Sequence, residues 1–289
     1  MSVYDIVMEQ IIAKLEKGVI PWKQTWKSGQ LPMNYVTRKP YRGINVVLLS
    51  GHPYSSPCYM SFKQISERGG RIKAGEAGHP VLFFKPVSDR DDGETSYLVM
   101  RYYRVWNIQQ TTLEEQETSP MTELPSCNGI MASMPDIPRI DHGIANPCYI
   151  PWEDRILLPP VSEFESPEEY HAALFHELVH STGHEKRLMR FRTDARALFG
   201  SDSYSEEELV AEIGASFLCG RTGILPKTID NHGAYIHSWL ERIKSDKRIF
   251  IRAASAAQKA VDYITGQGSE QGLEVPPAVP VTEPVSQAA

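Results

Sequence analysis

The chain of 289 residues lacks several features that would assign it to a specialised class of protein. No stretch approaches the roughly 20 consecutive apolar residues that a membrane-spanning helix needs. The first residues carry neither the basic start nor the apolar run of a secretory signal peptide. The four cysteines stand far apart without CxxC spacing, which argues against a cysteine-bound zinc cluster and against a disulfide framework. We therefore expect a cytoplasmic protein with no membrane partner.

The charges are unevenly distributed along the chain, although the net charge is only −6. Residues 1–85 hold 12 Lys and Arg against 5 Asp and Glu, a balance of +7, and the remaining residues have a balance of −13. This asymmetry indicates two domains with different partners, which we expect at residues 1–111 and 141–266. The stretch 112–140, rich in Glu, Thr, Ser and Pro, is expected to be a linker or mobile loop, and the tail 267–289 to be disordered.

One short segment of the rear half carries the residues of a zinc site. His176, Glu177 and His180 form an HExxH pattern. Residues four apart lie on the same face of a helix, so that the two imidazoles can bind one Zn²⁺ ion. Glu177 would flank the ion and take a proton from water activated by the metal, which is the chemistry of a zinc peptidase. The alternative interpretation is a pair of surface histidines on an amphipathic helix.

The residues around this pattern predict a helix over residues 167–182. Ser166 and Pro167 have the types found at an N-cap and at the first helical position, and Glu169 completes a capping box. Gly183 supplies a stop three residues after the second histidine. The two histidines are therefore expected in the last turns of the helix.

Two further parts of a peptidase site are expected in neighbouring segments. The strand-like run 146–158 is placed to hold an extended substrate by main-chain pairing. A donor to the oxyanion could come from Tyr235, His232 or His237, and the sequence does not choose among them.

A catalytic zinc site needs a third protein ligand. A histidine six residues after the second would serve, but that position is Lys186, and His184 follows the helix stop, where an orienting or surface role suits it better than ligation. The next predicted helix offers Glu208 and Glu212, one turn apart. We assign Glu208 as the ligand and Glu212 as the group that orients a ligand histidine. The exchanged roles stay open, because Ser205 and Glu208 also match a capping box that would leave Glu212 as the ligand.

The front half combines aromatic and basic side chains. A helix is expected over residues 3–18, with strands over 80–86 and 97–108, and 14 of the 27 aromatic residues fall within the first 110 positions. Cations neutralise phosphates and exposed rings stack on unpaired bases, so this mixture predicts binding to single-stranded DNA. The alternative is that most rings form the core, as we expect for Tyr102 and Phe83, and that the lysines form a solvated face. The predicted DNA-binding residues are Trp22, Lys23, Trp26, Lys27, Arg38, Lys39, Arg42, Arg71 and Lys73.

Several separated motifs, taken in order, resemble the ArdC-like antirestriction proteins of plasmids and phages. The resemblance covers roughly residues 1–110 and 143–262, and the stretch between them matches no pattern of the family. It is far more specific than HExxH alone. The motifs are Pro21-Trp22 with Trp26, Pro40-Tyr41-Arg42-Gly43-Ile44-Asn45, Gly75-Glu76-x-Gly78-x-Pro80-Val81, Tyr103-Arg104-Val105-Trp106-Asn107, the run from His176 to His184, and the run from Glu207 to Ala215.

The resemblance implies an α+β protein made of a small α/β domain that binds single-stranded DNA and a zincin-like metallopeptidase domain, mainly helical with a small sheet. It implies a role in protecting incoming mobile DNA from host restriction, with a host restriction component or another protein as a possible substrate. It does not establish proteolysis. A DNA-binding protection protein whose metal site is only structural, and a plain intracellular peptidase, therefore stay as alternatives.

Overall fold

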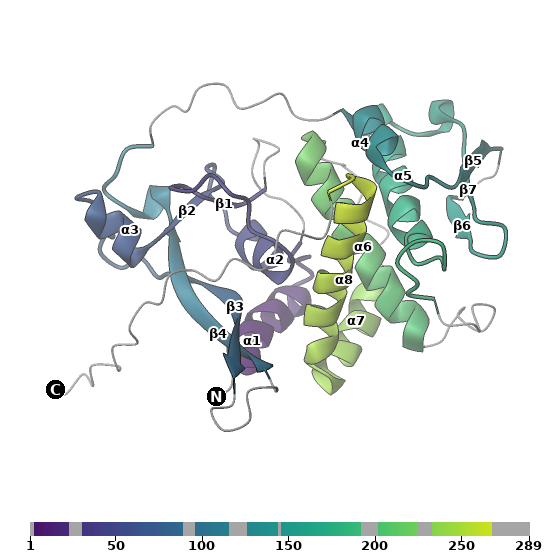
Figure 1. Cartoon of the computed structure of the whole chain (residues 1–289). Helices are drawn as coiled ribbons and strands as arrows, with labels where there is room; N and C mark the ends of the chain where they lie inside the picture. Colours follow the sequence, from purple (N-terminus) through teal and green to yellow (C-terminus); the bar gives the residue numbers. More distant parts are fainter. Residues whose placement is uncertain are drawn as a thin grey trace.

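The computed structural model describes residues 3–22, 31–88, 96–115, 126–143, 146–191, 202–224 and 233–267. Within these ranges, the predicted α+β architecture is confirmed. Figure 1 shows a four-stranded sheet at one end of the molecule, a three-stranded sheet at the other end, and helices between them. The helices are α1 (Val3–Glu16), α2 (Ile44–Ser50), α3 (Phe62–Glu67), α4 (Cys127–Ser133), α5 (Pro167–Ser181), α6 (Asp202–Thr222), α7 (Gly233–Ser245) and α8 (Arg248–Ile264), with short 3₁₀ turns at Ile108–Gln110 and Val161–Glu163.

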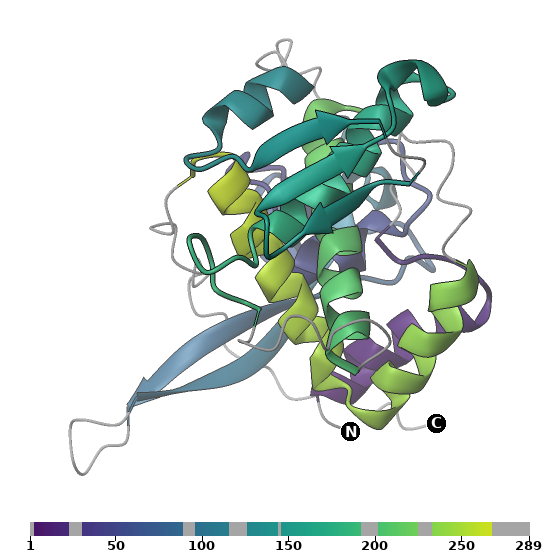
Figure 2. The same ribbon diagram turned by 90° about the vertical axis from the view of Figure 1, so that its right-hand side faces the viewer.

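The four-stranded sheet belongs to the front half and has the order β1-β2-β4-β3. The predicted strands over 80–86 and 97–108 are confirmed as β3 and β4, which form a long antiparallel hairpin. Figure 2 shows this hairpin projecting away from the helices. The strands are β1 (Met33–Asn34), β2 (Cys58–Ser61), β3 (His79–Ser88) and β4 (Ser96–Asn107).

The front sheet has a small apolar cluster on each side of its centre. Leu49 of α2 packs with Tyr59, Val81 and Val105 in one cluster. The second cluster places Ile65 of α3 against Met33, Cys58, Met60 and Ile108. The clusters do not cover all of β4, because Tyr102 and Arg104 of this strand are exposed.

The three-stranded sheet has the order β5-β7-β6, with β5 parallel and β6 antiparallel to β7. Its strands β6 and β7 lie against α5, so that the strand-like run expected over 146–158 is confirmed as a pair of strands beside the HExxH helix. The stretch 112–140, expected as a linker, contains α4 and the start of β5 where the structure describes it. The strands are β5 (Arg139–His142), β6 (Cys148–Ile150) and β7 (Arg155–Leu158).

One large hydrophobic core joins the two halves of the chain. It combines apolar residues of α1 and α2 with those of α5, α6, α7 and α8. The Trp22 ring lies 5.4 Å from the ring of Trp239 and 5.6 Å from that of Phe250, measured between centroids. Ion pairs between the halves add to this contact: Lys244 Nζ lies 2.6 Å from Glu16 Oε1, and Arg42 pairs with Asp262 at 2.5 Å.

Among the helices that the structure describes, none combines the length and the apolar character needed to cross a lipid bilayer. The tail beyond residue 267, for which we expect disorder, lies outside the described residues.

Candidate metal centre

The HExxH segment lies on α5, which forms as its sequence predicts. Helix α5 runs from Pro167 to Ser181, and the side chain of Ser166 accepts a hydrogen bond from the amide of Glu169. Thr182 is the C-cap, so that the helix ends two residues before Gly183. The two histidines therefore face the same side of the last two turns.

Helix α6 brings the acidic residues to this face of α5. It begins at Asp202 among the described residues, so Ser205 lies inside the helix and does not form an N-cap, and the capping alternative for Glu208 is wrong. The two helices approach each other closely at Gly214, where an added Cβ atom would lie 2.8 Å from Val179 Cγ2. The absence of a side chain at Gly214 thus permits close packing of the two helices, which lets the carboxylates of α6 reach α5.

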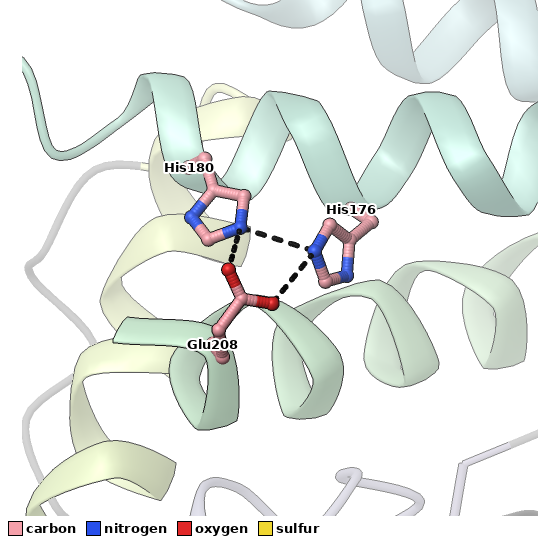
Figure 3. Close-up of side chains that lie close together, drawn as sticks. All are labelled: His176, His180 and Glu208. Atoms are coloured by element: carbon pink, nitrogen blue, oxygen red, sulfur yellow. Dashed lines mark hydrogen bonds and ion pairs between the residues drawn. The ribbon is translucent and has the colours of Figure 1, made fainter. Parts of the chain in front are cut away.

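Three side chains from the two helices point toward a common centre (Figure 3). The Nε2 atoms of His176 and His180 are 3.0 Å apart, and Glu208 places Oε2 3.6 Å from His176 Nε2 and Oε1 3.4 Å from His180 Nε2. A tetrahedral ion with bonds of about 2.1 Å holds its ligand atoms about 3.4 Å apart, so the spacing of these three donors fits such an ion. Within the part of the chain that is described, these are the residues whose donor atoms can share a metal.

The electrostatics of the cluster favour a positive charge at its centre. Burial lowers the pKa of both imidazoles, but their contacts with carboxylates outweigh this effect. The pKa of His176 is raised well above its usual range by Glu208 and Glu212, and Glu207 with Glu208 raises the pKa of His180 to about 9. Burial raises the pKa of Glu208, yet its contacts with the two imidazoles lower it strongly on balance. Glu208 therefore stays ionised beside the two imidazoles, and its negative charge also attracts a divalent cation.

Each imidazole has a carboxylate on its second nitrogen. Glu212 Oε1 lies 3.4 Å from His176 Nδ1, as expected for the group that orients this ligand. Glu207 Oε1 lies 3.6 Å from His180 Nδ1, a contact that we did not predict from the sequence. Contacts of this kind fix the orientation of a ligand imidazole and raise its basicity. The assignment of Glu208 to the metal and Glu212 to its histidine agrees with this geometry, and Glu207 plays the same part for His180.

Arg190 holds Glu207 in place. Its guanidinium donates to Glu207 at 2.6 and 3.1 Å, to the Thr182 hydroxyl at 2.7 Å, and to the carbonyl oxygen of Val179 at 2.9 Å. Burial raises the pKa of Glu207, and Arg190 lowers it to below its usual range. Arg190 lies nine residues after the end of α5, and no spacing rule relates it to α6, so this contact had no signal in the sequence.

Glu177 is buried on α5 beside the small sheet. Its charge acts on the ionisation of both ligand imidazoles and, after the larger effect of burial, raises the pKa of the Cys148 thiol on β6. Glu177 is therefore close enough to both the metal cluster and the edge strand β6 for its charge to act on groups in each. This is the position that a general base would need if an extended peptide pairs with β6.

The remaining rear-half candidates are not part of the cluster. His184 lies in the turn after α5, and its Nδ1 accepts a hydrogen bond from the amide of Lys186 at 3.2 Å. Of the expected oxyanion donors, His232 and the side chains of Tyr235 and His237 lie outside what the structure describes.

The predicted DNA-binding residues fall into different environments. Trp22 is only 3% exposed and packs in the shared core, so its ring is not available for stacking and that prediction is wrong. Arg42 pairs with Asp262 of α8, so its guanidinium serves a contact within the chain at the junction of the halves. Lys23, Trp26 and Lys27 lie outside the described residues.

The other predicted cations are exposed on the front half. Arg38 lies over the Tyr35 ring, with its guanidinium carbon 4.6 Å from the centroid, and Lys73 Nζ donates to the carbonyl oxygen of Gln109 at 2.8 Å. Lys39 and Arg71 are also exposed. Tyr102, expected in the core, is exposed as well, whereas Phe83 is half-buried. The four cations keep the positive charge of the front half accessible to solvent.

Comparisons with known proteins match both halves of the chain. A family model described as a zincin-like metallopeptidase matches residues 134–256, and a model described as the N-terminal domain of anti-restriction factor ArdC matches residues 1–124. The solved metal-free structure of the antirestriction ArdC protein from plasmid R388 is 34% identical, with a TM-score of 0.77, over 92% of this chain and 98% of that one. Its Mn(II)-bound structure is 31% identical, with a TM-score of 0.77, over 94% of this chain and 100% of that one.

Two curated relatives are also similar over most of the chain. The uncharacterized protein y4eC of Sinorhizobium fredii is 30% identical over 93% of this chain and 93% of its own length. The DNA primase TraC of Escherichia coli is 31% identical over 90% of this chain, which spans only 27% of the length of that primase. The donor set of the cluster in this chain suits a divalent metal.

Proposed function

Because the chain belongs to the ArdC-like family of antirestriction proteins, we propose that it protects the incoming DNA of a mobile element in the cytoplasm by binding single-stranded DNA and by a zinc-dependent metallopeptidase site. The observation that carries the second part is the convergence of His176, His180 and Glu208, from two adjacent helices, with spacings that suit a tetrahedral ion. One Zn²⁺ ion per chain fits this donor set.

The residues around the cluster support peptide hydrolysis. A zinc ion bound there would activate water and polarise a carbonyl group. Glu177 would accept the proton of the attacking water and deliver it to the leaving amine. The edge strand β6 would hold an extended segment of a protein substrate, such as a host restriction component, by main-chain hydrogen bonds beside Glu177.

The decisive experiment separates metal binding from catalysis. The purified full chain is expected to contain one divalent ion, measured by mass spectrometry of the metal, and the variant Glu177→Gln should retain it. Restriction of transferred DNA is then compared in recipient cells that contain the wild-type protein or this variant. Loss of protection in Glu177→Gln supports proteolysis, whereas full protection would show that the metal site is structural.

A matched control uses a neighbouring glutamate that does not reach the cluster. Glu206 lies on α6 beside Glu207, but its contact is with Arg252 on the surface at 3.4 Å. The variant Glu206→Gln should retain both the metal and protection. If it lost either one, the effect of Glu177→Gln could not be ascribed to the loss of a base.

The DNA-binding part is tested on the same preparation. Fluorescence anisotropy with single-stranded and double-stranded oligonucleotides at two salt concentrations should show tighter binding to the single strand and a loss of affinity at the higher salt concentration. Equal and negligible binding to both forms would leave a plain peptidase as the explanation of the metal site.

A further inference from the structure

The front half has a second group of aromatic residues, separate from the predicted tryptophan segment. The ring of Phe62, at the start of α3, is 61% exposed, and that of Tyr102 on β4 is 38% exposed. Trp106 lies two strand positions beyond Arg104 on β4 and is half-buried, with its ring centroid 6.4 Å from that of Phe62. Large exposed rings cost solvation free energy and suit a surface that meets a partner.

The strand register places three of these side chains on one face of the sheet. β4 pairs with β3 up to Val105 and with β2 from Val105 onward, so residues 102–106 are paired without an interruption. Side chains two residues apart therefore point to the same side, which aligns Tyr102, Arg104 and Trp106 over about 13 Å. Phe62 extends this row, because its ring contacts Trp106.

The backbone at Gly78 packs closely against two residues of this row. A Cβ atom at Gly78 would lie 2.6 Å from the ring of Trp106 and 3.0 Å from Cβ of Arg104, so the backbone approaches both residues on the same face. The guanidinium of Arg104 donates one hydrogen bond to the Gly78 carbonyl oxygen at 3.1 Å. The bond fixes the guanidinium beside the rings, while the residue stays exposed and has further donors available.

We propose that Phe62, Tyr102, Arg104 and Trp106 form the surface on which single-stranded DNA stacks. Unpaired bases stack on exposed rings and the guanidinium pairs with phosphate, a combination that a double helix with its bases enclosed cannot use. The net charge of residues 1–85 is positive, and Lys63, Arg71 and Lys73 are exposed on this half. These positive charges complement the negative phosphates of single-stranded DNA. This inference rests on the proposed binding of single-stranded DNA. The exposed rings take the stacking role that the sequence analysis assigned to Trp22.

The test compares exposed surface rings on the two halves. Phe62→Ala and Tyr102→Ala should each weaken binding of a labelled oligothymidine by about fivefold to a hundredfold, measured by anisotropy with the full chain. The matched control is Trp152→Ala, because that ring is 62% exposed but lies on the turn between β6 and β7 in the rear half. It should bind the oligonucleotide like the wild type. Thermal unfolding should be the same for all variants, since these rings are outside the core.

Arg104→Gln gives a second, independent readout. Removing one phosphate contact should reduce the slope of log Kd against log salt concentration by about one, an effect that loss of a ring does not produce. The inference is overturned if Phe62→Ala and Tyr102→Ala both bind within about threefold of the wild type, or if Trp152→Ala weakens binding as much. A wild-type protein that binds no single-stranded DNA would overturn the proposed function as well, so the two failures are distinguishable.

Discussion

Each half of the molecule contains a pair of neighbouring, largely buried histidines, and the two pairs favour opposite charge states. In the front half, the rings of His52 and His79 have centroids 3.9 Å apart. Burial, His79 and Lys14 lower the pKa of His52 to about 3, and burial also lowers the pKa of His79. In the rear half, the centroids of His176 and His180 are 4.7 Å apart, and the pKa of both is raised.

The difference lies in what surrounds each pair. The rear pair has carboxylates in direct contact, whereas the carboxylate of Glu76 reaches the front pair through an amide. Gln110 Oε1 lies 3.1 Å from His79 Nε2, and the Gln110 amide nitrogen donates to Glu76 Oε2 at 2.8 Å. Two adjacent imidazoles are therefore not sufficient for a metal centre, because the direct carboxylate contacts set the field that a cation requires.

The largest expected effect comes from removing the carboxylate that faces both rear imidazoles. Glu208→Gln keeps the size of the side chain but removes its charge, and it should weaken binding of Zn²⁺ or Mn²⁺ by more than about 100-fold, the upper range for groups that only orient a ligand. Competition with a coloured chelator measures the change. Glu212→Gln should lose less of the affinity for the metal ion. A larger loss in Glu212→Gln than in Glu208→Gln would exchange the roles of the two residues.

A smaller loss is expected when Glu207 can no longer orient His180. Glu207→Gln should weaken metal binding by about 10- to 100-fold, because His180 loses the carboxylate on its Nδ1 atom. Competition with the coloured chelator again measures the change, and Glu206→Gln on the same turn of α6 should bind the metal like the wild type. Unchanged affinity in Glu207→Gln would show that Arg190 and Glu207 only stabilise the fold.

The front pair should make the protein sensitive to acid. A histidine with a lowered pKa contributes full stability above the unfolded pKa of about 6.5, and that contribution is lost as the pH falls toward the folded value of about 3. At about pH 5.5 the wild type should therefore lose about 1 kcal/mol through His52 relative to about pH 7.5. Urea unfolding at both pH values should show a smaller loss in His52→Gln. An equal loss in both proteins would assign the acid sensitivity to other groups.

The smallest effect concerns the positive charge beside the front pair. Lys14 Nζ donates to the carbonyl oxygen of Gly51 at 3.3 Å and lowers the pKa of His52 less than burial does. Lys14→Met should therefore raise the pKa of His52 only part of the way toward its ordinary value of 6.5, as followed by NMR titration of the imidazole protons. A rise to the full unfolded value would show that the lysine outweighs burial.

The parts of this molecule that follow from local spacing could be predicted from the sequence. The caps of α5 and the four-residue separation of His176 and His180 predicted the helix and its metal-binding face, and the strand-like apolar runs predicted β3 and β4. The burial of Trp22 could not be predicted, because Trp239 and Phe250 that cover it are more than 200 residues away in the chain. The contact of Arg190 with Glu207 and that of Phe62 with Trp106 depend in the same way on how separate elements pack.

The core that joins α1 and α2 to α6, α7 and α8 has a practical consequence for dissecting the protein. A fragment ending near residue 115 would expose Val7, Ile11, Leu15 and Trp22 to water, and the complementary fragment would uncover Trp239 and Phe250. Both pieces would present large apolar surfaces and tend to aggregate. Loss of function after such a cut would report collapse of the shared interior, so point substitutions in the intact polypeptide are the sound way to separate its two activities.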